Sequence, residues 1–347
     1  MKITRILLSL ITVTSLFVSC QSDDDNSLIE PVSEERIIVS HEGASVSGST
    51  SIISLDLKTV NNKFYDTVNE EELGVFQQSI GFNDDKAYIV VDNQNTITVV
   101  DKVSFKKQAS ITEKLKTPRY IAFANGKGYV TNWGDTSLAT DDFIAVIDLA
   151  SNTVESTIAV AEGPEQSVIK GNKLYVSHKG GFGINNRVSV IDLSTSNVKE
   201  IETLFLPDEM VLVGDDLWVS CEGTPVWRPE GESIGGLIKI DTTTDEITSS
   251  IEFPLGQHTS QMVFENGNIY YTVSNEIFEF AITETTLPTT AVTEGAINGM
   301  AIRDGIIYVV DAKDFASGGT LNTYDLNEEK WGTPVTVGVA PAKIYFQ

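Results

Sequence analysis

The chain has 347 residues, of which 41% are hydrophobic and 21% are charged, and it carries 49 acidic but only 24 basic side chains. Its formal net charge is −25 at pH 7. Nucleic acids and anionic lipid surfaces are therefore poor partners, because both would be repelled.

The first 19 residues have the features of a secretory signal peptide. Lys2 and Arg5 precede an apolar run over residues 6–18, which is too short to span a bilayer comfortably. The run ends in the letters LFVSC, which resemble the lipobox of bacterial lipoproteins. That resemblance implies that Cys20 is diacylated and becomes the mature N-terminus, with a membrane contact through the lipid only. The alternative is a plain signal peptide with an incidental cysteine.

Residues 20–35 are polar and lack the apolar periodicity of a packed element, which predicts a flexible tether. The acidic cluster 23–25 resembles the export signal that sends lipoproteins of the Bacteroidetes to the outer face of the outer membrane. A solvated spacer is the alternative. Once Cys20 is acylated, Cys221 is the one remaining cysteine, so no internal disulfide can form.

A tract of about 45 residues recurs along residues 36–347, and its clearest copies begin at Thr117 and Gly163. Each copy holds an apolar strand, a Gly/Asn/Asp turn, a strand centred on Tyr-Val, a variable loop, a strand ending in Ile-Asp-Leu and a last β-branched strand. Four antiparallel strands per repeat are typical of a propeller blade. The sequence therefore predicts an all-β, seven-bladed β-propeller.

The residue that closes the third strand marks the register of the seven repeats. It is predicted at Asp56, Asp101, Asp148, Asp192, Asp241, Ala281 and Asp325. A carboxylate before a turn can accept backbone N–H groups, so the recurring aspartates are predicted to be structural.

The last residues repeat the first strand of a blade, since Pro341–Phe346 follows the pattern of Pro118–Phe123. The first repeat lacks its opening strand, so the C-terminal strand is predicted to complete it and close a ring. Closure removes exposed sheet edges. A solenoid is the alternative, but a tail that completes the first repeat favours a ring, and hence one domain.

Long departures from the repeat are almost all loops between second and third strands, which predicts one variable face. Rigid aromatic side chains are usual anchors for a ligand or a partner. Half of these rings are expected to cover blade ends instead. The candidate binding residues in these loops are Trp133, Phe182, Arg187, Trp227, Arg228 and Phe315.

Two histidines, His178 and His258, are further candidate ligand contacts on this face. Their spacing forms no metal site, and neither catalytic residues nor a cofactor is predicted.

The two residues that open each first strand are mostly polar and differ between blades, which suggests a funnel for an asymmetric ligand. A water-filled channel is the alternative. The candidates there are Arg119, Tyr120, Gln166, Glu209, Gln261 and Asn298.

The patterns P-x-x-x-x-F-x-N-G-K-x-Y-V and V-x-V-I-D-L-x-T-x-x-V resemble the YVTN or YncE-type seven-bladed propellers. Together with the lipobox they are similar to DUF5074-like propeller lipoproteins, including BtuG-type surface proteins. That resemblance implies capture of a nutrient, with cobalamin or another corrinoid leading, for a TonB-dependent outer-membrane transporter. The alternatives are a lactonase- or lyase-like propeller enzyme and a protein-binding scaffold.

Overall fold

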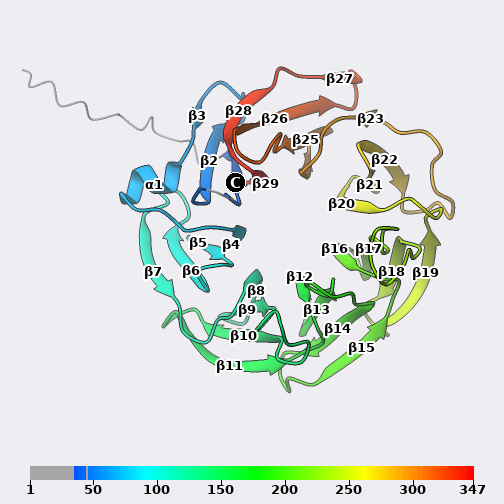
Figure 1. Ribbon diagram of the computed structural model, residues 1–347, viewed down its shortest axis with the longest axis horizontal. Helices are drawn as coiled ribbons and strands as arrows, with labels where there is room; N and C mark the ends of the chain where they lie inside the picture. The colour runs from blue at the N-terminus through cyan, green and yellow to red at the C-terminus, as the bar shows by residue number, and fades with distance from the viewer. Residues whose placement is uncertain (1–34, 44–45) are drawn as a thin grey trace, which may run out of the picture. The chain divides into compact units, whose positions relative to one another are not determined.

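The computed structural model describes residues 35–43 and 46–347, within which the chain forms seven antiparallel sheets around a central channel (Figure 1). The predicted signal peptide, Cys20 and nearly all of the predicted tether lie outside the described residues. The sequence prediction of a seven-bladed propeller is confirmed.

Blade 1 is built from both ends of the chain. It contains, from the channel outward, β29 (Pro341–Phe346), β1 (Arg36–His41), β2 (Ser49–Ser54) and β3 (Val60–Asn61). The register pairs Ile38 with Tyr345 and Val39 with Ile344. The predicted closure by the C-terminal strand is thus confirmed.

Blades 2 to 4 follow the repeat, with four strands each in chain order from the channel outward. Blade 2 has β4 (Gln77–Asn83), β5 (Lys86–Val91), β6 (Thr96–Asp101) and β7 (Lys107–Ile111). Blade 3 has β8 (Pro118–Ala124), β9 (Lys127–Asn132), β10 (Phe143–Asp148) and β11 (Thr153–Ala159). Blade 4 has β12 (Pro164–Lys170), β13 (Lys173–His178), β14 (Arg187–Asp192) and β15 (Val198–Glu202).

Blades 5 to 7 vary at the outer edge. Blade 5 has β16 (Pro207–Val213), β17 (Asp216–Cys221), β18 (Gly236–Asp241) and β19 (Glu246–Glu252). Blade 6 has β20 (Thr259–Glu265), β21 (Asn268–Val273), β22 (Glu276–Ala281) and a two-residue β23 (Thr293–Glu294). Blade 7 has β24 (Gly299–Arg303), β25 (Ile306–Asp311) and β26 (Gly318–Asp325), whose outer edge pairs with both β27 (Lys330–Trp331) and β28 (Val335–Val339).

The core lies between neighbouring blades, where apolar side chains from the facing sheets interdigitate. The aromatic position of the second strand is buried in most blades, as at Tyr88, Tyr175 and Trp218. A short helix, α1 (Phe64–Asn69), covers the outer part of blade 1, where β3 is brief. Its Phe64 and Tyr65 complete the apolar cluster between blades 1 and 2.

The recurring aspartates hold the turns, as predicted. Asp148, for example, accepts the N–H groups of Ala150 and Ser151 at 2.9 and 2.8 Å. The register of blade 1 differs from the prediction in one detail. In blade 2 the third strand ends at Asp101, which pairs with Lys86. In blade 1 the equivalent residue is Ser54, which pairs with Arg36, so Asp56 lies two residues beyond the end of the strand. The two extra residues form the turn that Asp56 caps through the Lys58 N–H at 3.2 Å.

Candidate functional site

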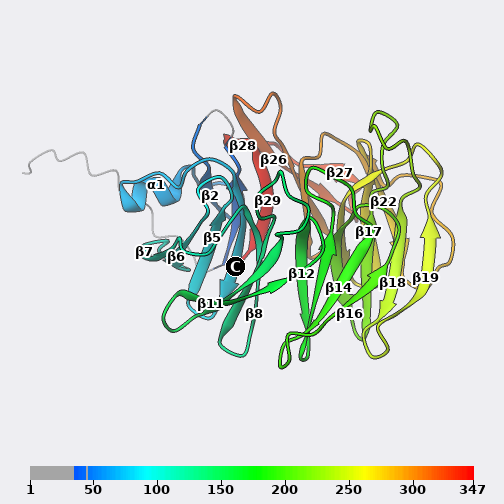
Figure 2. The same cartoon turned by 60° about the horizontal axis from the view of Figure 1, so that its bottom comes forward.

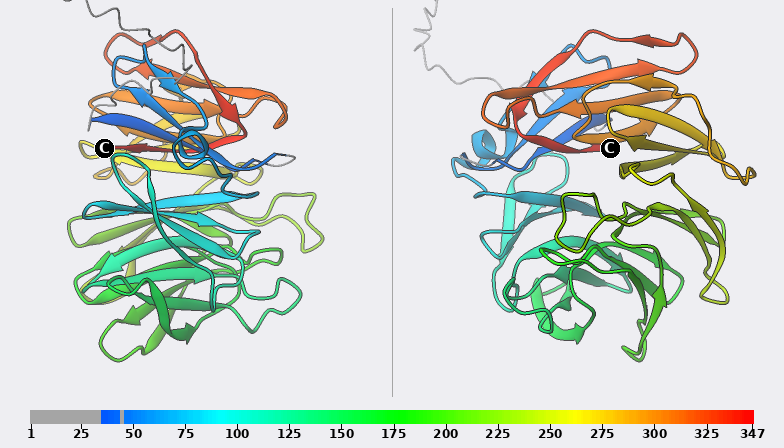
Figure 3. Two further views of the ribbon diagram at one scale, coloured as in Figure 1. Left: turned by 90° about the vertical axis from the view of Figure 1, so that its left-hand side faces the viewer. Right: turned by 45° about the vertical axis from the view of Figure 1, so that its right-hand side comes forward.

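The long loops stand out from one side of the ring, which we call the loop face (Figures 2 and 3). It carries the loops between second and third strands and the links between blades. A β-bulge near the start of the inner strand recurs there, as between Pro118 and Ile121 and between Pro164 and Ser167. Bulges re-aim side chains. In blades 2 to 6 they present two successive polar residues to the channel, and blades 7 and 1 add Asn298 and Lys343 at the equivalent places. These residues form what we call the mouth.

The second residue of each pair in blades 2 to 6, together with Lys343 of blade 1, lines a cavity of about 220 Å³ in the channel. This arrangement agrees with the polar funnel that the sequence predicts. The polar residues that line the cavity are Ser79, Tyr120, Gln166, Glu209, Gln261 and Lys343.

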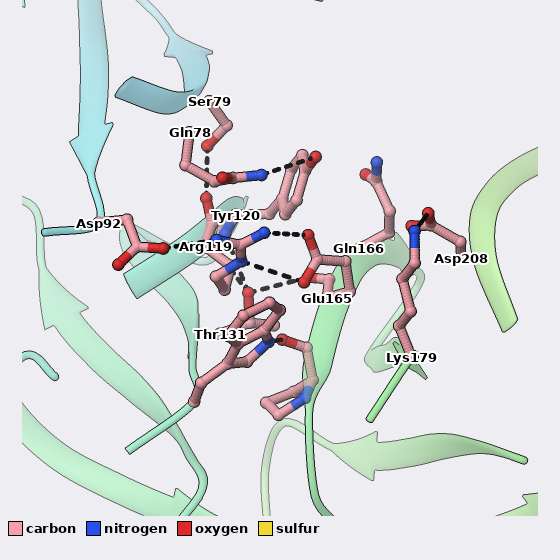
Figure 4. A network of polar contacts seen from close by, with 12 residues as sticks. Gln78, Ser79, Asp92, Arg119, Tyr120, Thr131, Glu165, Gln166, Lys179 and Asp208 are labelled. Carbon is pink, nitrogen blue, oxygen red and sulfur yellow. Dashed lines mark hydrogen bonds and ion pairs between the residues drawn. The ribbon is translucent and has the colours of Figure 1, made fainter. Parts of the chain in front are cut away.

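Arg119, the first residue of the blade 3 pair, is the centre of a buried ion network (Figure 4). Its guanidinium donates to Asp92 at 2.5 Å and to both oxygens of Glu165 at 2.8 and 3.1 Å. The ring of Trp133 lies 3.8 Å from the guanidinium carbon, in cation–π contact. The network joins blades 2, 3 and 4 and fixes Arg119 in one orientation.

Lys179 continues the network into blade 5. Its ammonium group contacts Asp208 and Glu222, each at 2.7 Å. Two carboxylates against one cation leave a local excess of negative charge.

Lys343 reaches across the channel. Its ammonium group, carried by β29 of blade 1, lies 2.9 Å from Glu209 on β16 of blade 5 and 5.7 Å from the centre of the Tyr120 ring. Gln166 donates to the other oxygen of Glu209 at 3.1 Å. These contacts obstruct the channel, so a ligand at this face would meet a polar floor instead of an open pore.

Burial shifts the pKa values of the carboxyl groups in the mouth and directly around it. It raises the pKa of Glu222 to about 7 against the opposing effect of Lys179, and it raises the pKa of Glu209 in spite of Lys343. It also raises the pKa of Asp92 and of Glu42, each against the pull of Arg119. At Asp208 burial has the same tendency, but Lys179 and Lys343 outweigh it and the pKa is lowered.

Three of the four candidate aromatic residues in the loops, Trp133, Phe182 and Trp227, form a connected set next to Arg119. The ring of Trp133 makes an edge contact with Phe182, and its indole N–H donates to the Pro164 carbonyl at 3.0 Å. Arg228 links two loops by donating to the Phe182 carbonyl at 3.3 Å, and its guanidinium lies over Trp227. Phe182 and Trp227 are 73% and 74% exposed, so both rings are available to a ligand.

The two candidate histidines differ in accessibility. His178 is fully buried and bonds Ser189 at 2.7 Å, and burial lowers its pKa to about 4. Its side chain therefore holds blade 4 together and does not face the mouth. His258 is partly exposed, contacts the Glu222 carbonyl at 2.8 Å and has Nε2 3.5 Å from Glu232.

Three more candidates lie outside the network. Arg187 forms an ion pair with Glu200 on the outer strand β15. Asn298 donates to the Pro341 carbonyl at 2.7 Å and so ties blade 7 to the closing strand. Among the described residues, no side-chain hydrogen bond, ion pair or ring contact joins Phe315 to the mouth.

The sequence analysis left Asp92, Lys179 and Glu222 out of the candidate site, although each contributes to the ion network. All three directly follow a second strand, as Glu42 and Trp133 do. That position recurs in every blade, so the repeat register contained the signal that could have identified them.

Two kinds of feature are absent from the described residues. Within them, no three His, Cys, Asp or Glu side chains are grouped so as to hold a metal ion. The same residues contain no helix of the length and apolarity that a membrane span requires.

Comparison with known proteins places the chain in a family. The family model described as "Domain of unknown function (DUF5074)" matches residues 38–300. The chain belongs to the DUF5074 family. No curated protein matches the sequence.

Solved structures similar to this DUF5074 propeller share its fold at low sequence identity. A protein from Lactobacillus plantarum is 14% identical with a TM-score of 0.63, over 90% of this chain and 99% of that one. Apo AztD from Citrobacter koseri is 15% identical with a TM-score of 0.53, over 89% and 97%. The dihydro-heme d1 dehydrogenase NirN, solved in complex with DHE, is 11% identical with a TM-score of 0.56, over 89% and 74%.

Proposed function

We propose that this DUF5074 propeller is a surface lipoprotein of the outer membrane that captures a nutrient, with a corrinoid such as cobalamin as the ligand. In this proposal the lipid on Cys20 holds the propeller at the membrane and a TonB-dependent transporter receives the ligand. Membership in the DUF5074 family and the resemblance of residues 16–20 to a lipobox support it.

The observation that carries the proposal is the pairing of a polar mouth with exposed rings. Tyr120, Gln166 and Gln261 offer hydrogen-bonding groups in the cavity. The exposed rings of Phe182 and Trp227 are linked to the mouth through Trp133 and Arg228. A corrinoid is flat and fringed with amides, so the rings can cover its face while its amides meet the mouth. The cavity of about 220 Å³ is too small for the whole ligand, which would lie over the mouth with an edge inserted.

Calorimetric titration of residues 28–347 with cyanocobalamin tests the proposal. We expect one-to-one binding that weakens by about tenfold or more in Trp227→Ala and in Gln261→Ala, as loss of a central contact does. Phe315→Ala is the matched control, because it removes another exposed ring that is not joined to the mouth. Absence of heat and of a thermal shift with every corrinoid tried would exclude this ligand class.

Anchoring is tested separately in cells. Cys20→Ser should abolish incorporation of radiolabelled palmitate and release the protein from the membrane fraction. External protease should digest the wild-type protein on intact cells if it is exposed at the surface. Protection of the anchored protein from protease would contradict the surface location.

A further inference from the structure

A groove with a volume of about 690 Å³ lies at the outer part of blades 5 and 6. This volume falls within the range of about 300–1,000 Å³ that is usual for ligand pockets. None of the mouth residues lines it. One wall is the end of β19, and the other is the segment Thr285–Thr289 that follows β22, which lie near each other at the periphery in Figure 1.

The β19 wall exposes backbone. Three consecutive residues, Ser250, Ile251 and Glu252, line the groove, which is possible only where the edge of a strand is open. The Phe253 N–H donates to the Gly235 carbonyl at 2.9 Å, on the β18 side. Backbone groups alternate in direction along an antiparallel strand, so those of Ser250 and Glu252 point outward to the groove. Among the described strands, only β18 pairs with β19.

The opposite wall is open because blade 6 is nearly without an outer strand. Its β23 pairs with only two residues of β22, Glu276 and Ile277. The chain between β22 and β23 instead crosses as a loop that packs Leu287 against the core of blades 5 and 6. This loop leaves room for an extended segment beside β19.

The floor of the groove is aromatic. Phe278 is partly buried and stacks on Tyr271, with ring centres 5.5 Å apart and an angle of 17° between the planes. Pro254 extends the apolar surface toward the loop face. A side chain directed inward from an added strand would therefore rest on apolar atoms.

The charges at the groove have one sign. Glu252 and Glu276 are the charged residues that line it among the described part of the chain, and both are exposed. A second copy of this chain would bring the same carboxylates to the contact and be repelled. A segment with Lys or Arg would be attracted and held in register.

We propose that this groove binds an extended, basic segment of a partner protein, which adds a strand to the outer edge of β19. Main-chain hydrogen bonds to Ser250 and Glu252 would supply affinity, and alternate side chains would supply specificity. An apolar residue would contact Phe278, and its basic neighbours would lie near Glu252 and Glu276. This inference does not depend on the ligand proposed for the mouth.

Fluorescence anisotropy with a labelled synthetic peptide of eight alternating Lys and Val residues tests it. We expect saturable binding to the wild-type protein, and binding weaker by about tenfold in the Glu252→Gln/Glu276→Gln double variant. Glu328→Gln/Glu329→Gln removes the same charge from an exposed turn of blade 7 and should leave binding within about twofold of wild type.

The strand geometry is tested with the peptide backbone. Two peptides are compared, one with N-methyl groups on the odd-numbered amides and the other with N-methyl groups on the even-numbered amides. These two phases have the same charge and composition. One phase should lose binding by about tenfold or more, since it blocks the donors that face β19, while the other retains it. Ser250→Pro, which removes an outward N–H at an edge, should weaken binding as well.

The results that overturn the proposal are distinct from those for the mouth. They are absence of saturable peptide binding, equal affinity for both methylated phases, or equal affinity for a peptide with Glu in place of Lys. Each outcome can be read without any corrinoid, so failure here leaves the proposed capture function unaffected.

Discussion

Arg119 shows how a single side chain organises the mouth. Its guanidinium neutralises Asp92 and Glu165, and all three side chains are largely shielded from water. The cost of burying two carboxylates is met only while the cation is present, because an unpaired charge in a protein interior is strongly destabilising.

Arg119→Gln should therefore lower the free energy of unfolding by about 3–5 kcal/mol, as removal of one partner of a buried ion pair does. Urea denaturation at pH 7 measures it. Lys58→Gln breaks an exposed pair with Asp56, where both side chains are more than half exposed, and should cost far less. Equal losses in the two variants would refute the view that burial makes the Arg119 network important.

Removal of the charge of Asp142 is expected to stabilise the fold, whereas removal of the charge of Arg119 is expected to destabilise it. Its carboxyl accepts the Gly163 N–H at 2.5 Å, but burial raises its pKa to about 6. The folded protein thus holds this proton more tightly than the unfolded chain, so ionisation of Asp142 removes stability as the pH rises from about 4 to about 6.

Asp142→Asn should keep the hydrogen bond and remove this penalty. We expect the variant to be more stable than wild type at pH 7, by up to about 3 kcal/mol, and its stability to decline less between pH 4.5 and 7. Urea denaturation at both pH values checks it. Asp84→Asn, the same substitution in an exposed hairpin turn, is the control. A parallel decline in Asp142→Asn and wild type would count against the assignment.

At the level of single residues, the sequence predicted part of the lining of the cavity. Tyr120, Gln166, Glu209 and Gln261 line the cavity because they share a place in the repeat. His178 looked equally suitable, but its side chain points into the blade. The direction of a side chain near a strand end depends on the loop that follows, so the repeat pattern does not predict it.

The elements themselves were more predictable. Strands β9, β13 and β17 lie within the predicted repeats, because each is a short strand that follows a turn signal and is buried at every position after the first. The exceptions lie at outer edges, where packing is weak. The two-residue strands β3 and β23 and the split between β27 and β28 have no signature in the repeat.

Strand β29 is the element on which the ring depends. Deletion of residues 341–347 would leave β1 without its inner neighbour and would remove Ile344 from the core between blades 7 and 1. We expect the truncated protein to lose its cooperative thermal transition, and a synthetic peptide of residues 340–347 to restore it. Circular dichroism during heating measures both.

Lys343→Met separates closure from the ion pair across the channel. The strand remains, so we expect a cooperative transition at a lower temperature, because Glu209 loses its cation. A truncated protein that melts like wild type without added peptide would show that closure contributes little.

For the whole molecule, net charge is the property with a measurable consequence. A chain with a formal charge of −25 repels itself in the folded state, and salt screens that repulsion. We expect the melting temperature at pH 7 to rise between about 10 and 300 mM NaCl, by a few degrees. Sucrose at equal osmolality is the control. A fall in melting temperature with salt would mean that ion pairs outweigh the repulsion.

The place of Lys343 also has a consequence for biosynthesis. Lys343, which reaches into the mouth, belongs to β29, and this strand follows all the other described strands in the sequence. A nascent chain that has completed six blades therefore has neither a closed ring nor a finished mouth. Both form together once β29 has been synthesised, because a chain that stops before β29 lacks the inner strand of blade 1 and the cation that faces Glu209. Synthesis of one short strand thereby couples closure of the ring to completion of the mouth.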